Sequence, residues 1–485
     1  MKKINKILFI RTNPWKPHYG SSHPLGCMML ASAVRKWVDP NMQMKIVDLN
    51  SKKMPTAGLA NVFREFDPDL VGFSTLSVEH LDLIEALKTC KSWSQECTTV
   101  LGGPHGTVFG DLLIDNPDID FIVRGEGEYT FVELLQTLRD GGDFKKINGL
   151  MYKDGDETVE TGPRPFETEL DALPLPAWDL VDLDEFSKAT TMNGFLSATP
   201  YAAVMSTRAC PYNCLYCHSI FGKKFRTRSK DHFMEELQLL HDRFGVRELH
   251  IVDDCFNLRE NRAVEICKDI VDRNLDFKIC FPNGIRGDKM SANLIHSLKS
   301  AGTYMMTYAV ESSSPRIQKL VQKNLNVDKA KEAIEITYKE GIVPCGFFML
   351  GFPTETLEEI EDTIKFACDS SLIKASFFTV VPFPRSKLMA FAQKCYPDLE
   401  FLGDKSLNID YWSDRPFYTE ATGIDILAKQ RTAYRKFYFD PVRIARAIKT
   451  VPMNKHVLRS IGYGLQSGFS VVEQLNKLRS TSAGK

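Results

Sequence analysis

The sequence predicts an α/β protein with three parts: a Rossmann-like doubly wound domain, a partial (βα)6 TIM-like barrel and a small helical C-terminal region. Two observations support this class. Short apolar runs alternate with helical patterns in two separate blocks, one before residue 140 and one after residue 201. A segment with several prolines divides the blocks, and the alternation stops near residue 395. A chain of 485 residues is also long for a single core.

The first block contains short apolar runs that suit buried parallel strands, with helical patterns such as Leu25–Val38 and Leu81–Ser92 between them. Ligands of such sheets bind at the carboxyl ends of the strands. The predicted strands are Ile7–Ile10, Met44–Val47, Leu70–Phe73, Thr99–Leu101 and Asp120–Val123.

A connecting region follows the first block. Ile147–Thr158 reads as a hairpin with Asp154 and Gly155 at its turn. The prolines in Leu173–Asp179 exclude a helix or an interior strand there. The expected domain limits are therefore 1–140, 141–200, 201–395 and 396–485.

Six further βα units predict the barrel, whose chemistry is expected at the carboxyl ends of its strands. Helical patterns follow most of these strands, as at Asp231–Phe244, Glu260–Arg273 and Glu358–Asp369. The predicted strands are Ala202–Met205, Glu248–Val252, Phe277–Phe281, Tyr304–Ala309, Gly346–Leu350 and Phe377–Val381.

Composition narrows the class further. A hydrophobic fraction of 43% and a charged fraction of 25% are typical of a globular protein in water, and a net charge of −1 gives no sign of a nucleic-acid partner. No apolar run is long enough to span a bilayer, and Arg11 ends the first apolar run too early for a signal peptide. Twelve cysteines without a regular framework indicate a reducing compartment, so a cytoplasmic location is expected.

Three cysteines lie after the first barrel strand with the spacing C-x3-C-x2-C: Cys210, Cys214 and Cys217, with Tyr216 before the third. Three thiolates on one loop can hold three irons of a [4Fe–4S] cluster and leave the fourth iron open for a small molecule. The alternative is a zinc site that His218 completes, although structural zinc sites usually have two C-x2-C pairs.

This motif resembles the signature of the radical S-adenosylmethionine (SAM) enzymes, and residues 201 to about 390 resemble the barrel of that family. In the family, the cysteines bind the cluster, SAM chelates the open iron, and electron transfer cleaves SAM to methionine and a 5′-deoxyadenosyl radical. The resemblance implies that Cys210, Cys214 and Cys217 are the catalytic metal ligands and that Tyr216 lies in the cofactor site. An electron donor such as flavodoxin or ferredoxin is implied as a partner.

Other barrel strands end in polar or glycine residues. Asp253 and Asp254 resemble the position that binds the methionyl amine of SAM, but they could instead cap a helix. Glu311 could accept hydrogen bonds from ribose hydroxyls and Arg286 could pair with a carboxylate, or both could form structural ion pairs. The segment around Gly351 resembles the family's adenine-packing strand end.

Two strand ends of the first block carry candidate binding elements. Ser74-Thr75-Leu76 follows the predicted strand Leu70–Phe73, and Gly102-Gly103-Pro104-His105 follows the next predicted strand, Thr99–Leu101. Glycines there let a ligand approach the backbone, although a Gly-Gly pair usually marks an ordinary turn. The two elements resemble the S-x-L and G-G elements of cobalamin-binding domains. Val123–Glu128 resembles the segment that closes the cobalamin-binding domain in radical enzymes. The resemblance therefore covers roughly residues 5–140.

One element of many cobalamin domains is absent. Their D-x-H-x-x-G motif, in which the histidine ligates cobalt, is replaced here by Arg11–Trp15, and His18 does not match the spacing. We therefore expect cobalamin without a protein histidine on its lower face, with His105 as the nearest alternative ligand.

Two other interpretations of the first block remain open. A nucleotide-binding or degenerate α/β module is one, although a G-x-G-x-x-G loop is absent after the first strand. A methylthiotransferase-like domain with a second cluster is the other, and Cys27, Cys90 and Cys97 are its available cysteines.

Together the resemblances imply a cobalamin-dependent radical SAM enzyme that acts on a small molecule of unknown class. Most of the family's known chemistry is methylation of unactivated carbon or phosphorus: one SAM methylates cobalamin, and a second supplies the radical that activates the substrate. An anaerobic oxidative cyclase or a carbon-skeleton rearrangement enzyme would share these motifs. A non-catalytic cobalamin sensor is a third hypothesis, against which the intact cysteine loop argues.

The C-terminal region predicts two helices, Ile424–Phe439 and Pro441–Thr450, and a disordered tail, Arg479–Lys485. Nine lysines and arginines stand against one carboxylate, Asp440, between residues 429 and 459. A solvated face on capping helices is the expected explanation, and peripheral contact with a membrane or an acidic substrate is the alternative. Cys255, Cys280 and Cys345 are expected to be small buried hydrophobes, and a hydrogen-donor or thiyl role has only their position in its favour.

Overall fold

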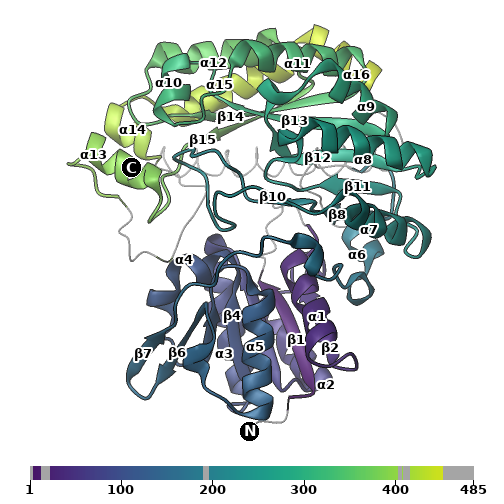
Figure 1. The fold of residues 1–485 in the computed structure, drawn as a ribbon. Coiled ribbons are helices and arrows are strands. Elements are labelled where there is room, and N and C mark those ends of the chain that lie inside the picture. Colours follow the sequence, from purple (N-terminus) through teal and green to yellow (C-terminus); the bar gives the residue numbers. More distant parts are fainter. Residues whose placement is uncertain (1–3, 13–21, 189–195, 402–406, 408–415, 452–485) are drawn as a thin grey trace.

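The structure is a computed structural model that describes residues 4–12, 22–188, 196–401, 407 and 416–451. These residues build two large sheets, one from each block of the sequence (Figure 1). The N-terminal sheet stands below the barrel sheet in this view; helices lie on both faces of the N-terminal sheet and on the outer side of the barrel sheet. The predicted α/β class and its order of parts are confirmed.

The N-terminal sheet has the strand order β2-β1-β3-β4-β5-β6-β7. Its first five strands are parallel, while β6 and β7 add to β5 as an antiparallel hairpin. The order reverses beside β1, and this switch point is where sheets of this type bind ligands. The strands are β1 (Lys6–Thr12), β2 (Gln43–Asp48), β3 (Leu70–Thr75), β4 (Thr98–Gly102), β5 (Phe121–Val123), β6 (Leu150–Asp154) and β7 (Glu157–Glu160).

Helices lie on both faces of this sheet. One buried cluster joins it to α1 and α5, and a second joins it to α2, α3 and α4. The helices are α1 (Leu25–Trp37), α2 (Leu59–Phe66), α3 (His80–Trp93), α4 (Gly103–Leu113) and α5 (Gly127–Asp140), with short 3-10 turns at Thr56–Gly58, Ser77–Glu79 and Phe144–Lys146.

Two details differ from the sequence-based expectation. The hairpin β6–β7, expected in the connecting region, continues the N-terminal sheet through its pairing with β5. The residues after Gly102 form the start of α4 and not an extended loop. Pro104 favours this because its fixed φ suits the first turn of a helix and its missing N–H is not needed there.

The barrel sheet has six parallel strands in sequence order from β8 to β15, and β8 and β15 are its two edges. This agrees with the predicted partial barrel. The strands are β8 (Tyr201–Val204), β11 (Glu248–Ile251), β12 (Lys278–Ile285), β13 (Thr303–Glu311), β14 (Val343–Leu350) and β15 (Lys374–Thr379). A separate two-stranded ribbon, β9 (Thr207–Arg208) and β10 (Arg226–Thr227), was not predicted.

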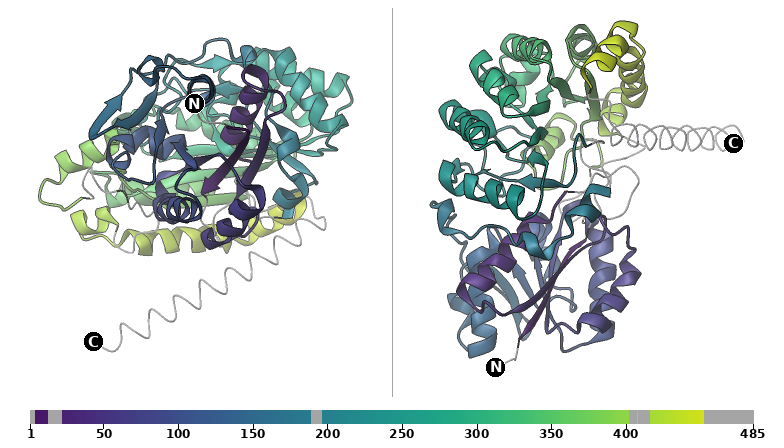
Figure 2. Two further views of the ribbon diagram at one scale, coloured as in Figure 1. Left: turned by 90° about the horizontal axis from the view of Figure 1, so that it is seen from below. Right: turned by 90° about the vertical axis from the view of Figure 1, so that its right-hand side faces the viewer.

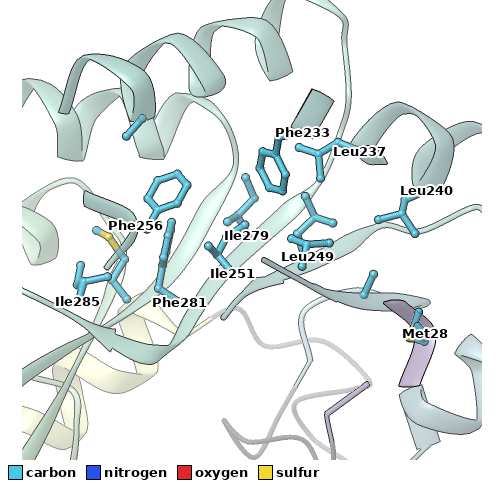
Figure 3. Packing of buried hydrophobic residues seen from close by; sticks show 14 of the residues in the cluster. Met28, Phe233, Leu237, Leu240, Leu249, Ile251, Phe256, Ile279, Phe281 and Ile285 are labelled. Atoms are coloured by element: carbon cyan, nitrogen blue, oxygen red, sulfur yellow. The ribbon is translucent and has the colours of Figure 1, made fainter. Parts of the chain in front are cut away.

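The barrel helices pack on the outer side of the sheet. Figure 3 shows Phe233, Leu237 and Leu240 of α7 against β11 and β12 side chains. The helices are α7 (Lys230–Asp242), α8 (Glu260–Asp272), α9 (Ala292–Ser300), α10 (Pro315–Leu320), α11 (Val327–Lys339), α12 (Leu357–Asp369) and α13 (Lys387–Cys395), with 3-10 turns at Phe256–Leu258 and Gly287–Lys289.

The connecting region joins the two domains through one continuous core. Trp178 is fully buried, and its indole N–H donates to Glu236 Oε1 of α7 at 2.9 Å. The neighbouring Ala177 donates its backbone N–H to the carbonyl oxygen of Met28 in α1 at 3.2 Å. Met28 therefore belongs to the same cluster as the barrel residues (Figure 3). The region also contains α6 (Leu183–Lys188) and 3-10 turns at Leu170–Ala172 and Trp178–Leu180.

The C-terminal helices cover one edge of the barrel. In α15 the Tyr434 hydroxyl accepts a hydrogen bond from the Phe377 N–H of β15 and donates one to the Phe377 carbonyl. The Tyr438 hydroxyl makes the same two bonds with Ala375 of β15. The turned views in Figure 2 show this yellow-green layer beside the barrel. The helices are α14 (Phe417–Thr422), α15 (Ile426–Tyr438) and α16 (Pro441–Thr450). In the part of the chain that the structure describes, no helix has the length and apolar character needed to cross a bilayer.

Candidate active site between the two domains

The cysteine loop connects β9 to β10 at the carboxyl end of β8. Ala209 takes a left-handed conformation with φ 71°, which turns the chain into the loop. Leu215 then fixes the loop from both sides: its N–H donates to the Val321 carbonyl at 3.0 Å, and its own carbonyl accepts from the Leu388 N–H at 3.0 Å. The loop is thus held between the barrel mouth and α13.

The three thiols differ in environment. Cys210 and Cys214 are half-buried and Cys217 is exposed. A hydrogen bond from the Cys255 thiol lowers the pKa of Cys210 to about 6. Cys255, expected to be a buried hydrophobe, is indeed buried but also lies against a predicted cluster ligand.

The donor set fits a [4Fe–4S] cluster better than a single metal ion. Among the described residues, no three His, Cys, Asp or Glu side chains converge on one ion. Each cysteine of an iron–sulfur cluster binds its own iron, so cluster ligands are spaced more widely than the ligands of one ion. Three thiols on one loop, one of them with a lowered pKa, suit that arrangement.

Asp253 and Asp254 follow β11 but face different partners. Asp253 Oδ1 accepts from the backbone N–H groups of Ser206 and Thr207 at 2.5 and 3.0 Å, and its Oδ2 accepts from the Ser206 hydroxyl at 2.6 Å. Asp253 therefore ties the entrance of the cysteine loop to β11, and its expected contact with SAM stays a prediction. Asp254 faces the cavity, 3.8 Å from His218 Nε2, and burial raises its pKa.

Arg286 and Glu311 both form ion pairs outside the cavity. Arg286 pairs with Asp288 at 2.8 Å, and its guanidinium lies 3.9 Å from the centre of the Tyr212 ring. Glu311 accepts from Lys323 Nζ at 3.0 Å. Both charges are thus paired inside the barrel mouth, as the structural alternative predicts, and their expected roles as SAM contacts stay predictions.

Gly351 is needed for packing within the protein. Its φ is +90°, and a Cβ there would lie 3.1 Å from Tyr418 and 3.2 Å from Ile426 of the C-terminal helices. Its N–H donates to Glu355 Oε2 at 2.7 Å. The C-terminal helices cover this face of Gly351, and the expected adenine contact stays a prediction. Tyr216, by contrast, lines the cavity, with its ring 5.9 Å from that of Phe352.

Ser74, Leu76, Gly102 and Gly103 lie together at the carboxyl edge of the N-terminal sheet and line the cavity. A Cβ on Gly103 would approach the Thr75 backbone to 3.0 Å, and φ is +78°, so the protein itself requires glycine there. A Cβ on Gly102 would meet nothing closer than 3.8 Å. The free space at Gly102 therefore suits a ligand laid on the sheet edge.

His105 is buried in α4 and is not among the residues that line the cavity, and its proposed role as a cobalt ligand stays a prediction. Its Nε2 is 3.1 Å from His80 Nδ1, and its Nδ1 is 3.3 Å from the Ser77 hydroxyl. Burial lowers its pKa to about 3, so the ring is neutral. The segment with Trp15 and His18 lies outside the described residues.

The cavity has a volume of about 1280 Å³ and receives side chains from both domains. It exceeds the usual range of about 300–1,000 Å³ for small-ligand pockets, so it suits a large cofactor or two ligands together. Its walls include the carboxyl ends of β3, β4 and β5 on one side and Cys214, Cys217 and Asp254 on the other. Cys27, Cys90 and Cys97 are buried in the N-terminal core, which argues against a second cluster there.

A buried ion-pair network joins the two walls, and sequence reasoning did not identify its partners. Arg208, two residues before Cys210, pairs with Glu128 at 2.5 Å and with Glu126 at 3.2 Å. Arg226 of β10 pairs with Glu126 at 2.8 Å. Burial raises the pKa of Glu128, but the Arg208 guanidinium outweighs it, so the pKa lies below its ordinary value. The sequence analysis had singled out only the N-terminal side of this network, the Val123–Glu128 segment, and not the arginines that pair with it.

Comparisons with known proteins agree with this geometry. Residues 18–135 match the B12 binding domain, and residues 204–367 match the Radical SAM superfamily. An uncharacterized methyltransferase of Pyrococcus horikoshii is 33% identical over 86% of this chain and 88% of its own length. The anaerobic magnesium-protoporphyrin IX monomethyl ester cyclase of Rubrivivax gelatinosus is 25% identical over 83% of this chain and 72% of its own.

Solved structures show the same fold. The radical SAM methyltransferase TsrM from Kitasatospora setae, with cobalamin and a [4Fe–4S] cluster bound, aligns with a TM-score of 0.66 at 16% identity over 80% of this chain and 74% of its own. The cobalamin-dependent radical SAM enzyme OxsB aligns with a TM-score of 0.65 at 17% identity over 82% of this chain and 56% of its own.

The chain belongs to the cobalamin-dependent radical SAM enzymes, in the branch that includes methyltransferases. Its cofactors are a [4Fe–4S] cluster, SAM and cobalamin.

Proposed function

We propose that this enzyme transfers a methyl group from SAM to an unactivated carbon of a small-molecule substrate by a radical mechanism. The observation that carries the proposal is the single cavity, which has the cysteine loop on one wall and the carboxyl edge of the N-terminal sheet on the other. When bound, the cluster with SAM supplies a hydrogen-abstracting radical and cobalamin supplies the methyl group. One cavity lets both act on one substrate without solvent between them.

In this proposal the cysteine loop is the cluster site. Cys210, Cys214 and Cys217 each hold one iron, and Tyr216 forms part of the wall beside them. Asp254 takes the ammonium group of SAM, because it is the carboxylate of the Asp253–Asp254 pair whose oxygens face the cavity. Asp253 positions the loop.

The carboxyl edge of the N-terminal sheet is the proposed cobalamin site. Ser74, Leu76, Gly102 and Gly103 form its floor. The buried position of His105 supports a cobalt without a protein histidine on its lower face. Electron paramagnetic resonance of the cob(II)alamin-loaded protein should show no histidine nitrogen coupling, and such a coupling would contradict this assignment.

We further propose that residues 1–140 hold cobalamin, that 141–200 connect the two domains, that 201–395 hold the cluster and SAM, and that the described part of 396–485 supports the barrel. The reaction needs an external one-electron donor, for which a flavodoxin or ferredoxin of the cytoplasm is proposed. The substrate is a small molecule that enters between the domains.

The test is the set of products formed from SAM. The protein is reconstituted anaerobically with iron, sulfide and cobalamin, given reductant and SAM, and its products are quantified by mass spectrometry. Methyl transfer predicts S-adenosylhomocysteine together with 5′-deoxyadenosine. The Cys217→Ala variant should lose 5′-deoxyadenosine, whereas Cys368→Ala, in α12, should retain both products.

A second candidate function is oxidative cyclisation. It is favoured by the likeness to the magnesium-protoporphyrin ester cyclases, which extends over most of this chain. A cyclase predicts 5′-deoxyadenosine without S-adenosylhomocysteine, so the same experiment separates the two functions.

A further inference from the structure

The solvent-facing side of α16 is apolar. Val442, Ile444 and Ile448 are 56%, 47% and 70% exposed, and Phe439 just before the helix is 79% exposed. Pro441 and Ala445 are exposed on the same side. The sequence led us to expect a solvated face on capping helices here, and the solvated face of α16 carries mainly apolar side chains. Single exposed apolar residues are ordinary, but a grouped set on one helix indicates a contact surface.

The opposite side of α16 is fixed to the barrel. The Arg443 guanidinium is buried and donates to the carbonyl oxygens of Ala367, Cys368 and Leu372, where α12 ends. It also lies 3.7 Å from the centre of the Phe437 ring. Ala447 packs against the buried cluster that contains Tyr304 and Val343. These contacts set the rotation of the helix, so its apolar side cannot turn inward.

Cations predominate around this apolar side, and Asp440, the N-cap of α16 beside Phe439, is the one carboxylate in the sequence between residues 429 and 459. From residue 441 to residue 472 the sequence contains five lysines and arginines and no aspartate or glutamate. Lys449 is exposed beside Ile448, and the Arg446 guanidinium lies 5.6 Å from the Tyr338 ring centre on the adjacent surface. Lys455, Arg459 and the tail lie outside the described residues. The surface therefore combines exposed apolar side chains with an excess of positive over negative charge.

We propose that the exposed side of α16, with Phe439, docks on an anionic lipid bilayer. An interfacial helix of this kind buries its apolar side chains at the headgroup boundary while its cations contact lipid phosphates. A second copy of this surface, or the cationic segment that follows it, would bring like charges together. The contact needs a partner with an anionic surface and an apolar interior, and an anionic lipid bilayer has both properties.

The surface lies far from the cavity. In Figures 1 and 2, α16 is on the outer side of the barrel, at the opposite end of the molecule from the N-terminal sheet. The contact thus attaches the enzyme to a membrane without covering the site between the domains. The inference is independent of the proposed reaction.

The test is sedimentation of the full chain with phosphatidylglycerol vesicles and, separately, with phosphatidylcholine vesicles. The matched variants are Ile448→Glu and Leu81→Glu, because the two side chains are 70% and 68% exposed and both changes add one negative charge. The wild type should bind the anionic vesicles, more weakly as salt rises. Ile448→Glu should lower the partition coefficient at least about tenfold, and Leu81→Glu should stay near the wild type.

Three results would overturn the proposal. The first is no sedimentation with anionic vesicles at low salt. The second is equal binding by Ile448→Glu and the wild type, which would locate lipid binding elsewhere. The third is a dimer in analytical ultracentrifugation that Ile448→Glu dissociates, which would assign the surface to a second copy of the chain. Circular dichroism of both variants checks that the fold is retained.

Discussion

Asp253 and Asp254 are adjacent in sequence, yet their side chains have different partners. Asp253 accepts three hydrogen bonds from Ser206 and Thr207, while Asp254 faces the cavity. Asp254→Asn should therefore weaken SAM binding about tenfold or more, because the charge opposite the ammonium group is lost, and should leave cluster content unchanged. Equilibrium binding of SAM and iron analysis measure the two effects.

The adjacent variant serves as the control. Asp253→Asn should lower the amount of cluster incorporated, because its amide nitrogen cannot accept the hydrogen bonds that hold the loop entrance. Equal effects of both substitutions on SAM affinity and on iron content would contradict the different roles assigned to the two carboxylates.

Glu79 lies under the loop that carries Leu76, and burial raises its pKa to about 8. Its Oε2 accepts from the Leu76 N–H at 2.8 Å. The folded state binds this proton more tightly than the unfolded state, where the pKa is about 4.5. Its contribution to stability is thus complete below that pH and declines as pH rises toward 8.

Glu79→Gln should remove this pH dependence, because the amide can accept the same hydrogen bond but does not titrate. Urea unfolding at about pH 5 and about pH 8.5 compares the two proteins. The wild type should lose more of its unfolding free energy between these values than the variant does. Identical losses would show that Glu79 does not titrate in this range.

At this scale the sequence predicted the motifs better than the roles of single residues. Cys210, Cys214 and Cys217 lie within one short segment, so their spacing can be recognised directly in the sequence. Arg286 and Glu311 acquire their partners, Asp288 and Lys323, only when the barrel mouth forms. The ion-pair alternative was open, but nothing in the sequence decided it.

At the scale of elements, hydrophobic periodicity predicted most strands and helices, and α16 has the predicted bounds. The strands β9 and β10 have two residues each, which is too short for an alternating pattern to identify. Their ribbon is nevertheless important, because it carries Arg208 and Arg226 to the N-terminal domain.

The edge strand β15 depends on α15 for its protection. Tyr434 and Tyr438 bond its backbone at Phe377 and Ala375 with distances of 2.9–3.3 Å. Replacing both tyrosines by phenylalanine should reduce the unfolding free energy by about 1–3 kcal/mol and promote aggregation through the uncovered edge. Tyr152→Phe, in β6, serves as the control. An unchanged urea midpoint for the double variant would contradict this role of α15.

At the scale of the whole molecule, the domains are held together by the shared core around Trp178 and by the buried Arg208 network. Arg208→Gln leaves Glu126 and Glu128 short of one cation, and breaking a buried pair costs about 3–5 kcal/mol. Stability and 5′-deoxyadenosine yield should both fall, and Arg208→Lys should restore part of each.

The matched control is Arg35→Gln, which breaks a half-exposed pair with Asp179 at the same interdomain boundary. Exposed pairs contribute about 0–1 kcal/mol, so this variant should remain close to the wild type. Equal effects of the two substitutions would contradict a special role for the buried network.

The sequence predicted both domains but not how they face each other. Their contacts join residues far apart in the chain, such as Arg208 with Glu128 and Ala177 with Met28, and periodicity within one element has no information on such pairs. The position of the cavity thus required the structure, although the strand ends that line it were predictable.

The central claim is that one cavity brings the cluster and cobalamin together. The most direct test is electron paramagnetic resonance of the holoenzyme with a reduced cluster and cob(II)alamin. The account predicts dipolar broadening of the cobalt signal, which disappears in Cys217→Ala because the cluster is lost. An unbroadened cobalt signal in a wild-type protein that contains both paramagnetic centres would contradict it.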